Sequence, residues 1–259
     1  MTFPFEAIHN FRDFGGYATP EGRVKRGLLF RSAHYAEATD ADLEAFRALG
    51  MTAIVDLRRP AERTRFATRR HPECGARLIA YGEPAPETEA PHLSYLHEDG
   101  VTEATISARM TEVYRELPYE DGHLEVFGKA FAALPDLDGP IVMHCHAGKD
   151  RTGLIVAFIQ HALGVGEADI LTDYLATNTK SRIEERLPHL IRTFRDNHGL
   201  EAPAHLMRHI WKVEKGYLDA ALDEIAARDG SLDGYLEKRL GVTPAMRAAL
   251  KARLVAREA

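Results

Sequence analysis

The most constraining part of the sequence is the segment 141–164, in which a short apolar run, a polar loop and a long apolar run follow one another. The first run, 141–143, predicts a buried strand, and the run that begins at Leu154 predicts a buried helix. The loop between them carries Cys145 and, six positions later, Arg151. A strand, a tight loop and a helix N-terminus in this order form an anion site, because loop amides point inward and the helix dipole favours negative charge.

The residue types in this loop indicate nucleophilic chemistry on a phosphate ester. Helix-end amides and nearby positive charge stabilise a thiolate, which makes Cys145 the candidate nucleophile. Arg151 is placed to bind two oxygens of a tetrahedral oxyanion with its planar guanidinium fork. A thiolate beside such a site can attack phosphorus and form a phosphocysteine, which water then hydrolyses.

The string His-Cys-x5-Arg-Thr-Gly at 144–153 resembles the signature loop of the cysteine-dependent phosphatases, the protein tyrosine phosphatase superfamily. Its full form, His-Cys-His-Ala-Gly-Lys-Asp-Arg-Thr-Gly, is similar to that of an atypical bacterial and fungal subgroup that includes a mycobacterial tyrosine phosphatase. The string Asn-Phe-Arg-Asp-Phe-Gly-Gly at 10–16 resembles an N-terminal motif of the same subgroup, although Arg12 and Asp13 alone would suggest a surface ion pair. The resemblance covers residues 8–180 in pieces and implies a tyrosine-phosphatase-like fold.

The leaving oxygen of a phosphate ester needs a proton, so a carboxylic acid must lie within hydrogen-bond reach. Asp150 is the first candidate, because it lies inside the loop and because the resembling subgroup assigns this role to its position. Asp56 is the second candidate. Asp99 and Asp121 are candidates by position alone, since many tyrosine phosphatases carry the acid on a movable loop upstream of the cysteine.

The remaining loop residues complete the expected site. His144 is expected to orient the loop and tune the thiolate, and Thr152 to hydrogen-bond the sulfur. Asp56 and Arg58 follow a predicted strand at the sheet edge that carries ligands in α/β proteins, although a salt-bridged loop is an equally good interpretation. No metal or other cofactor is expected, because basic side chains and amides supply the positive field. The predicted phosphate-binding residues are His146, Ala147, Gly148, Lys149 and Arg151.

Other interpretations of the loop fit less well. Gly148-Lys149 is typical of a nucleotide P-loop, but Asp150 stands where a magnesium-binding Ser or Thr belongs. The string His144-Cys145-His146 does not suggest a metal site, because adjacent strand residues point to opposite faces and the sequence holds no second cluster of ligands. A structural cysteine, a rhodanese-like sulfurtransferase and a non-catalytic phosphate-sensing module remain as alternatives, and turnover is the observation that separates them.

The expected substrate is a phosphotyrosine-containing protein. A phosphoinositide is the alternative, because a loop with a lysine at the position of Lys149 resembles the loop of phosphoinositide phosphatases as well. The net charge of −6 argues against a nucleic-acid partner, and no run approaches a membrane span, so no integral membrane contact is expected. Two cysteines do not make a disulfide framework, and the N-terminus resembles no signal peptide. The expected location is the cytoplasm, with leaderless secretion left open.

Alternating strand and helix patterns predict an α/β fold: a mostly parallel central sheet flanked by helices, with an added C-terminal helical region. We expect a single phosphatase domain over 1–259. The resemblance implies that 178–215 forms a helical lid, whereas the apolar stripe of this segment alone favours a surface helix packed on the core. Pro188 is expected to kink or break the segment. A hairpin is expected to end in a strand at 28–31, and one long helix is expected at 204–227. The segment 173–178 is interpreted as packing and a helix end.

Overall fold

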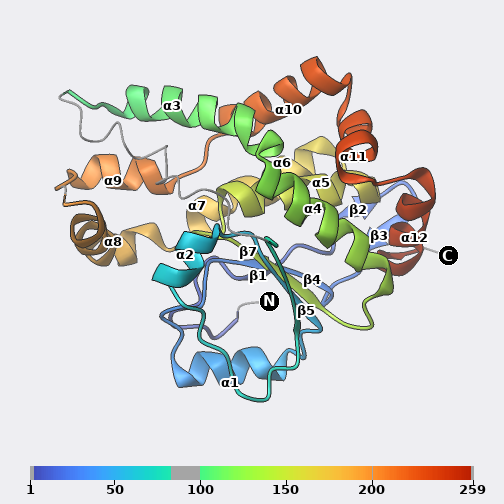
Figure 1. Ribbon diagram of the computed structural model, residues 1–259, viewed down its shortest axis with the longest axis horizontal. Coiled ribbons are helices and arrows are strands. Elements are labelled where there is room, and N and C mark those ends of the chain that lie inside the picture. The colour runs from blue at the N-terminus through green and yellow to red at the C-terminus, as the bar shows by residue number, and fades with distance from the viewer. Residues whose placement is uncertain (1–2, 83–99, 200, 258–259) are drawn as a thin grey trace.

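The computed structural model describes residues 3–82, 100–199 and 201–257 (Figure 1). Its centre is a five-stranded sheet in the order β1-β4-β7-β5-β6, in which β1 alone runs antiparallel to its neighbour. The predicted α/β fold with a mostly parallel central sheet is therefore confirmed. The sheet strands are β1 (Arg12–Asp13), β4 (Leu29–Ser32), β5 (Ala53–Asp56), β6 (Arg77–Ala80) and β7 (Ile141–His144).

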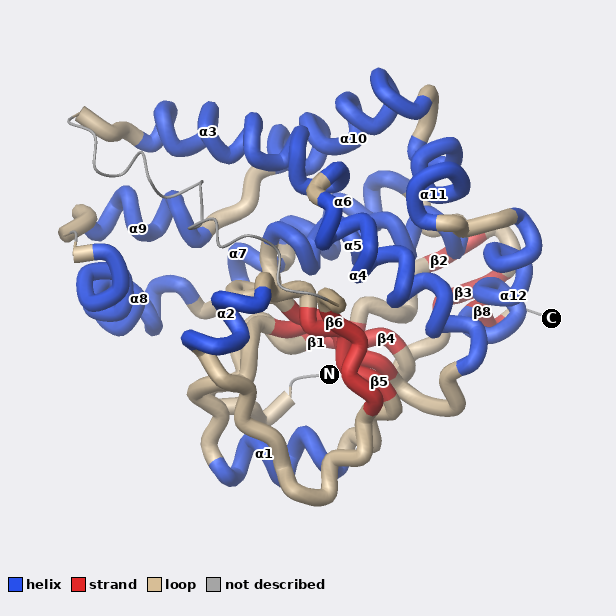
Figure 2. Tube along the Cα trace, in the orientation of Figure 1, coloured by secondary structure: helices blue, strands red, loops and turns tan. Residues whose placement is uncertain are grey.

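Helices cover both faces of this sheet (Figure 2). One face packs on the N-terminal segment and α1, and the other packs on most of the remaining helices. The helices are α1 (Asp40–Ala48), α2 (Pro60–Arg65), α3 (Glu103–Glu116), α4 (Asp121–Ala133), α5 (Asp150–Leu163), α6 (Glu167–Leu175), α7 (Thr177–Lys180), α8 (Ile183–His198), α9 (Ala204–Trp211), α10 (Lys215–Asp229), α11 (Leu232–Leu240) and α12 (Pro244–Leu254), with 3-10 turns η2 (Leu117–Tyr119) and η3 (Leu134–Asp136).

Successive strand residues point to opposite faces, so each central strand contributes to two cores. In β5, Ala53 and Val55 join the large core with α3, α4 and α5, whereas Ile54 joins the smaller core with α1. All four residues of β7 are buried. This double burial explains why the strand before the loop is apolar without alternation.

The parallel strands end in register at one edge of the sheet. Ser32 of β4 pairs with His144 of β7, which pairs with Asp56 of β5, which pairs with Ala80 of β6. The segments that follow these strands therefore start side by side, at the edge where α/β sheets bind ligands.

A small second sheet corrects the predicted hairpin. The hairpin joins β2 (Ala18–Thr19) to β3 (Gly22–Val24), and β3 also pairs with β8 (Val255–Ala256). The run at 28–31 instead enters the central sheet as β4. Its successive residues Leu29 and Phe30 point to opposite faces and fill the two cores.

Two helix boundaries in the C-terminal half differ from the prediction. Pro188 does not break α8, since buried Leu187 and Leu190 on either side of it pack into one small core with α9, and a kink at this residue stays a prediction. The helix expected at 204–227 is two helices, separated at 212–214. There the side chain of Asn178 hydrogen-bonds both the backbone N–H and the carbonyl of Val213, which holds the chain extended.

Several helices begin or end at residues typical of such positions. Thr39 and Asp42 form a capping box at the start of α1, and Ser231 and Thr243 cap α11 and α12. Gly164 ends α5 in the left-handed conformation that glycine adopts most easily. Within the described residues, no helix is both long and apolar enough to cross a membrane.

Candidate active site

The loop lies where the sequence places it, between the end of β7 and the start of α5. Cys145 follows the last strand residue and is only 2% exposed. The helix begins at Asp150, so Arg151 lies in its first turn. The amides of this turn have no partner inside the helix and are free to bind an anion.

Gly148 is the tightest point of the loop. Its φ of +67° is a left-handed value, and a Cβ built there would lie 2.2 Å from the carbonyl oxygen of Ser32. The loop therefore passes against the end of β4 at a distance that only glycine permits.

Arg151 is held by a residue that the sequence reading missed. Its Nη1 and Nη2 donate to the two carboxylate oxygens of Glu62 over 2.5 and 2.8 Å, and Nη1 also reaches the carbonyl of Leu57. Burial opposes both charges, but the pairing holds the pKa of Glu62 well below its usual range. Within the described residues, the Nε–H of Arg151 makes no hydrogen bond, so one edge of the guanidinium is open to an oxyanion.

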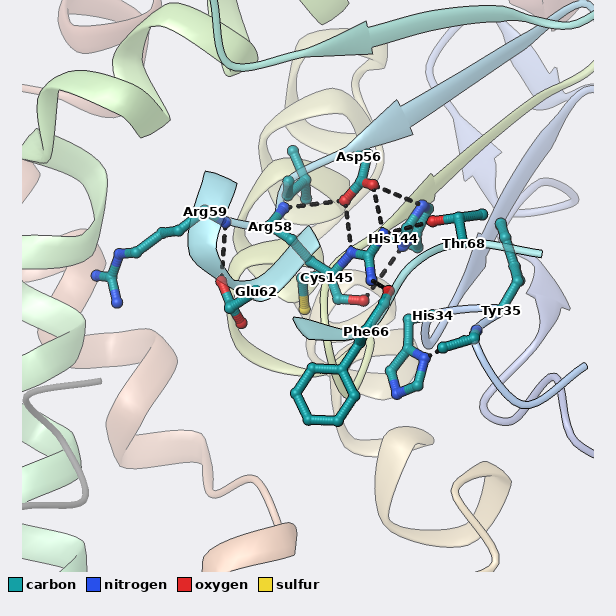
Figure 3. Close-up of polar contacts among 12 residues, drawn as sticks. His34, Tyr35, Asp56, Arg58, Arg59, Glu62, Phe66, Thr68, His144 and Cys145 are labelled. Atoms are coloured by element: carbon teal, nitrogen blue, oxygen red, sulfur yellow. Dashed lines mark hydrogen bonds and ion pairs between the residues drawn. The ribbon is translucent and has the colours of Figure 1, made fainter. Parts of the chain in front are cut away.

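Asp56, Arg58 and His144 form a buried group beside Cys145 (Figure 3). Arg58 donates from Nε and Nη2 to the two oxygens of Asp56 over 2.9 and 2.7 Å. Burial alone would raise the pKa of Asp56, but His144 and Arg58 lower it to about 2. Burial also lowers the pKa of His144, whose Nδ1 lies 3.2 Å from the carbonyl oxygen of Cys145. The salt-bridge interpretation of Asp56 and Arg58 is therefore confirmed, and the pair lies at the sheet edge from which the loop starts.

Asp150 faces a chain of two tyrosines. The hydroxyl of Tyr114 on α3 donates to Oδ1 of Asp150 over 2.8 Å and accepts a hydrogen bond from Tyr174 on α6. Lys149 lies 3.3 Å from the same oxygen. The carboxyl group is one-fifth exposed, unlike that of Asp56, which is almost completely enclosed.

Lys149 also contacts the end of α9. Its ammonium donates to the carbonyl oxygens of Ile210 and Lys212 over 2.8 and 3.4 Å. These carbonyls lie at the negative end of the helix, where a cation is favoured. The loop is thus joined directly to the connection between α9 and α10.

His146 lies in an aromatic group next to the loop. Its ring centroid is 4.6 Å from that of His34, 4.7 Å from that of Phe66 and 6.4 Å from that of Trp211. Burial lowers the pKa of His146 to about 4, so the ring is neutral at neutral pH. Together with the rings of His34, Phe66 and Trp211, this ring lines a small pocket beside the loop.

Two of the other predicted residues, Thr152 and Ala147, belong to the loop and the first turn of α5. The Thr152 hydroxyl is buried, and no described residue hydrogen-bonds it. The backbone carbonyl of Ala147 accepts a hydrogen bond from the side-chain amide of Asn10. Asp121 is exposed at the start of α4, and Asp99 lies outside the described residues.

A buried ionic cluster behind the loop was also missed. Arg12 and Arg31 both bind the carboxylate of Asp173, over 3.1 and 2.7 Å, and all three side chains are nearly inaccessible. Arg12 is therefore no surface residue. The sequence around Asp173 indicates only packing and a helix end, because nothing local indicates a partner more than a hundred residues away.

Comparison with known proteins agrees with this geometry. A family model described as the tyrosine phosphatase family matches residues 3–256. A Cupriavidus necator protein named as a tyrosine-protein phosphatase is 35% identical over 243 residues, covering 92% of this chain and 84% of the relative. The triple specificity protein phosphatase PtpB of Mycobacterium tuberculosis is 30% identical over 251 residues, covering 88% and 90%. The loop chemistry and these matches together make the chain an enzyme of the tyrosine phosphatase family.

Proposed function

We propose that this phosphatase hydrolyses phosphomonoesters through a phosphocysteine formed on Cys145. The observation that carries the proposal is the position of the thiol, at the carboxyl end of a buried strand and directly before a helix whose first turn holds Arg151. In this arrangement the sulfur faces a site built to bind an oxyanion.

In the first step, Sγ of Cys145 attacks phosphorus while the bond from phosphorus to the ester oxygen breaks. Arg151 and the loop amides bind the non-bridging oxygens and stabilise the charge of the transition state. The leaving oxygen takes a proton from a carboxylic acid. In the second step, water attacks phosphorus, the sulfur leaves as a thiolate, and the same carboxylate accepts the proton of the water.

Asp150 is the proposed acid. Its side chain is partly exposed beside the loop, and the hydroxyl of Tyr114 fixes one of its oxygens, while the other makes no hydrogen bond with a described residue. Asp56 is a weaker candidate, because Arg58 occupies both of its oxygens and its lowered pKa keeps it ionised. We assign Asp56 and Arg58 the supporting role of holding His144 behind the nucleophile.

We propose the remaining roles on the same basis. Lys149 adds a fixed positive charge next to the phosphate, and Thr152 hydrogen-bonds the sulfur once a charge develops on it. Because these groups and the amides supply the positive field, the reaction needs no metal ion. A chelator is therefore expected to leave the rate unchanged.

Phosphotyrosine in a protein is the proposed substrate, and a phosphoinositide is the second candidate. The second rests on Lys149 in the loop, since a second cation suits a ligand that carries several phosphates. The name of the mycobacterial relative, a triple specificity phosphatase, describes a broad substrate range for that protein.

We further propose one domain with a lid formed by 178–215, which contains α8 and α9. The support is contact: Trp211 lies near the ring of His146, and Lys149 binds the carbonyls at the end of α9. A cytoplasmic location is proposed with it, and export without a leader remains an alternative.

The deciding experiment measures phosphate release from a phosphotyrosine peptide and from a phosphoinositide, with a chelator present and with Cys145→Ser as the control. We expect release that depends on Cys145, and the ratio of the two rates identifies the preferred substrate. Equal turnover by Cys145→Ser would refute the covalent mechanism. Binding of the peptide without any release would favour the phosphate-sensing alternative.

A further inference from the structure

Two carbonyl groups of the phosphate loop are held from outside by side chains of the N-terminal region. The amide Nδ2 of Asn10 donates to the carbonyl oxygen of Gly148 over 2.8 Å and to that of Ala147 over 3.3 Å. Nη2 of Arg31 donates to the same Gly148 oxygen over 2.9 Å. Each of these bonds pulls a loop carbonyl away from the anion site.

A third carbonyl, of His146, accepts a hydrogen bond from the backbone N–H of His34 over 3.1 Å. In a planar trans peptide the carbonyl of one residue and the N–H of the next point in opposite directions. Fixing three successive carbonyls outward therefore turns the N–H groups of Ala147, Gly148 and Lys149 inward. These are amides on which an oxyanion-binding loop depends.

Asn10 is suited to this task by both its backbone and its side chain. Its φ of +55° is a left-handed value, which asparagine tolerates better than most residues, and it is 1% exposed. Arg12 donates from Nη1 to the Asn10 side-chain oxygen. Because a guanidinium only donates, this contact fixes which end of the amide is oxygen and leaves Nδ2 facing the loop.

We propose that Asn10 is a positioning residue for phosphoryl transfer, which acts by fixing the peptide groups of Ala147 and Gly148 so that the following amides face the phosphate. It does not touch the substrate itself. The inference rests on the proposed function, since it assumes that this loop binds the transferred phosphoryl group. It gives the N-terminal Asn-Phe-Arg-Asp string a part in the chemistry.

Two substitutions distinguish the loss of the N–H donor from the effect of an added negative charge. Asn10→Asp keeps the shape and the contact with Arg12 but replaces the N–H donor by an acceptor. Asn10→Gly removes the side chain without added charge and without strain at positive φ. The readout is the competitive inhibition constant of inorganic phosphate, measured with kcat and KM on a phosphotyrosine peptide.

We expect both variants to raise the inhibition constant about tenfold or more and to lower kcat/KM by a similar factor, while remaining folded. Direct removal of one oxyanion donor costs about 10²–10³ in rate, so an indirect loosening of two amides is expected to cost less. A purely structural role would lower the melting temperature and the active fraction, but it would leave the inhibition constant of the folded molecules unchanged.

Gln160→Glu is the matched control. Gln160 is a buried amide on α5 that donates to the carbonyl of Phe14 over 3.4 Å, and it makes no hydrogen bond with a described loop residue. Exchanging this amide for a carboxyl group is expected to lower stability without changing the inhibition constant of phosphate.

The outcomes are distinguishable. The inference is overturned if the wild type turns over and both variants of Asn10 keep the phosphate inhibition constant within twofold. It is also overturned if Asn10→Asp weakens phosphate binding but Asn10→Gly does not, because the effect would then be charge repulsion. If the wild type releases no phosphate, the proposed function fails, and calorimetric binding of inorganic phosphate to the three proteins still tests Asn10.

Discussion

Replacing Asp173 by asparagine is expected to destabilise the protein strongly, because two buried arginines depend on this carboxylate. Nε of Arg12 and Nη1 of Arg31 each bind one of its oxygens, and the three side chains are at most 8% exposed. Asparagine keeps the size and one acceptor oxygen but removes the negative charge. One guanidinium group would then face a neutral acceptor and the other an NH₂ donor in an enclosed site.

Removing one partner from a buried ion pair typically costs about 3–5 kcal/mol, because a charge is left without compensation. For a domain of this size, each kcal/mol corresponds to about 2–4 °C in Tm. We therefore expect Tm to fall by about 6–20 °C at neutral pH. The loss should appear as a lower urea midpoint with an unchanged slope.

The dependence of this loss on pH identifies its cause. Burial alone would raise the pKa of Asp173, but Arg12 and Arg31 hold it below its usual range. A carboxylate with a lowered folded-state pKa stabilises the protein fully above its unfolded pKa of about 3.9. That contribution is lost as the pH falls through the folded-state pKa. The difference in unfolding free energy between wild type and Asp173→Asn should therefore become smaller as the pH is lowered below about 4.

Asp233→Asn is the surface control. Asp233 binds Arg247 and His161, but its side chain is 62% exposed. An exposed pair of this kind contributes about 0–1 kcal/mol. Equal losses in the two variants, or a loss in Asp173→Asn that stays constant into the acid range, would refute the reasoning.

Three further substitutions test separate parts of the structure. Asp150→Asn should lower kcat/KM for a phosphotyrosine peptide by about 10²–10⁴, and much less for an aryl ester with a good leaving group; equal losses in steady-state assays would move the acid role elsewhere. Gly148→Ala must displace the backbone at Ser32, 2.2 Å from the new Cβ, so we expect the inhibition constant of phosphate to rise at least tenfold, and an unchanged constant would contradict this. Thr39→Ala removes the capping box of α1 and should cost about 1 kcal/mol in urea unfolding with kcat/KM unchanged; lost activity would show that α1 influences the site.

The sequence predicts those parts of the fold that depend on patterns among neighbouring residues. The apolar run before Cys145 and the helix after Asp150 are visible because periodicity and helix ends are local signals. Those signals also give Arg151 its position in the first turn. The candidate residues within the loop follow from this one segment.

The parts that it does not predict depend on distant partners. Glu62 holds Arg151 across 89 positions, and Asn10 reaches Gly148 across 138. Nothing near Glu62 in the sequence separates it from any other carboxylate on a helix. The break before α10 likewise comes from Asn178, a residue 35 positions upstream of the backbone that it binds. Such contacts exist only once the sheet has brought its loops together.

The small sheet has a consequence for the order of folding during synthesis. Its middle strand, β3, lies near the N-terminus, yet it pairs through Arg23 and Val24 with residues 255–256. A ribosome releases those residues only after every other strand and helix described in this fold has been made. During synthesis, one edge of the N-terminal hairpin therefore stays unpaired until residues 255–256 are available. A chain cut after α12 would keep the active-site loop but leave that edge open to other strands.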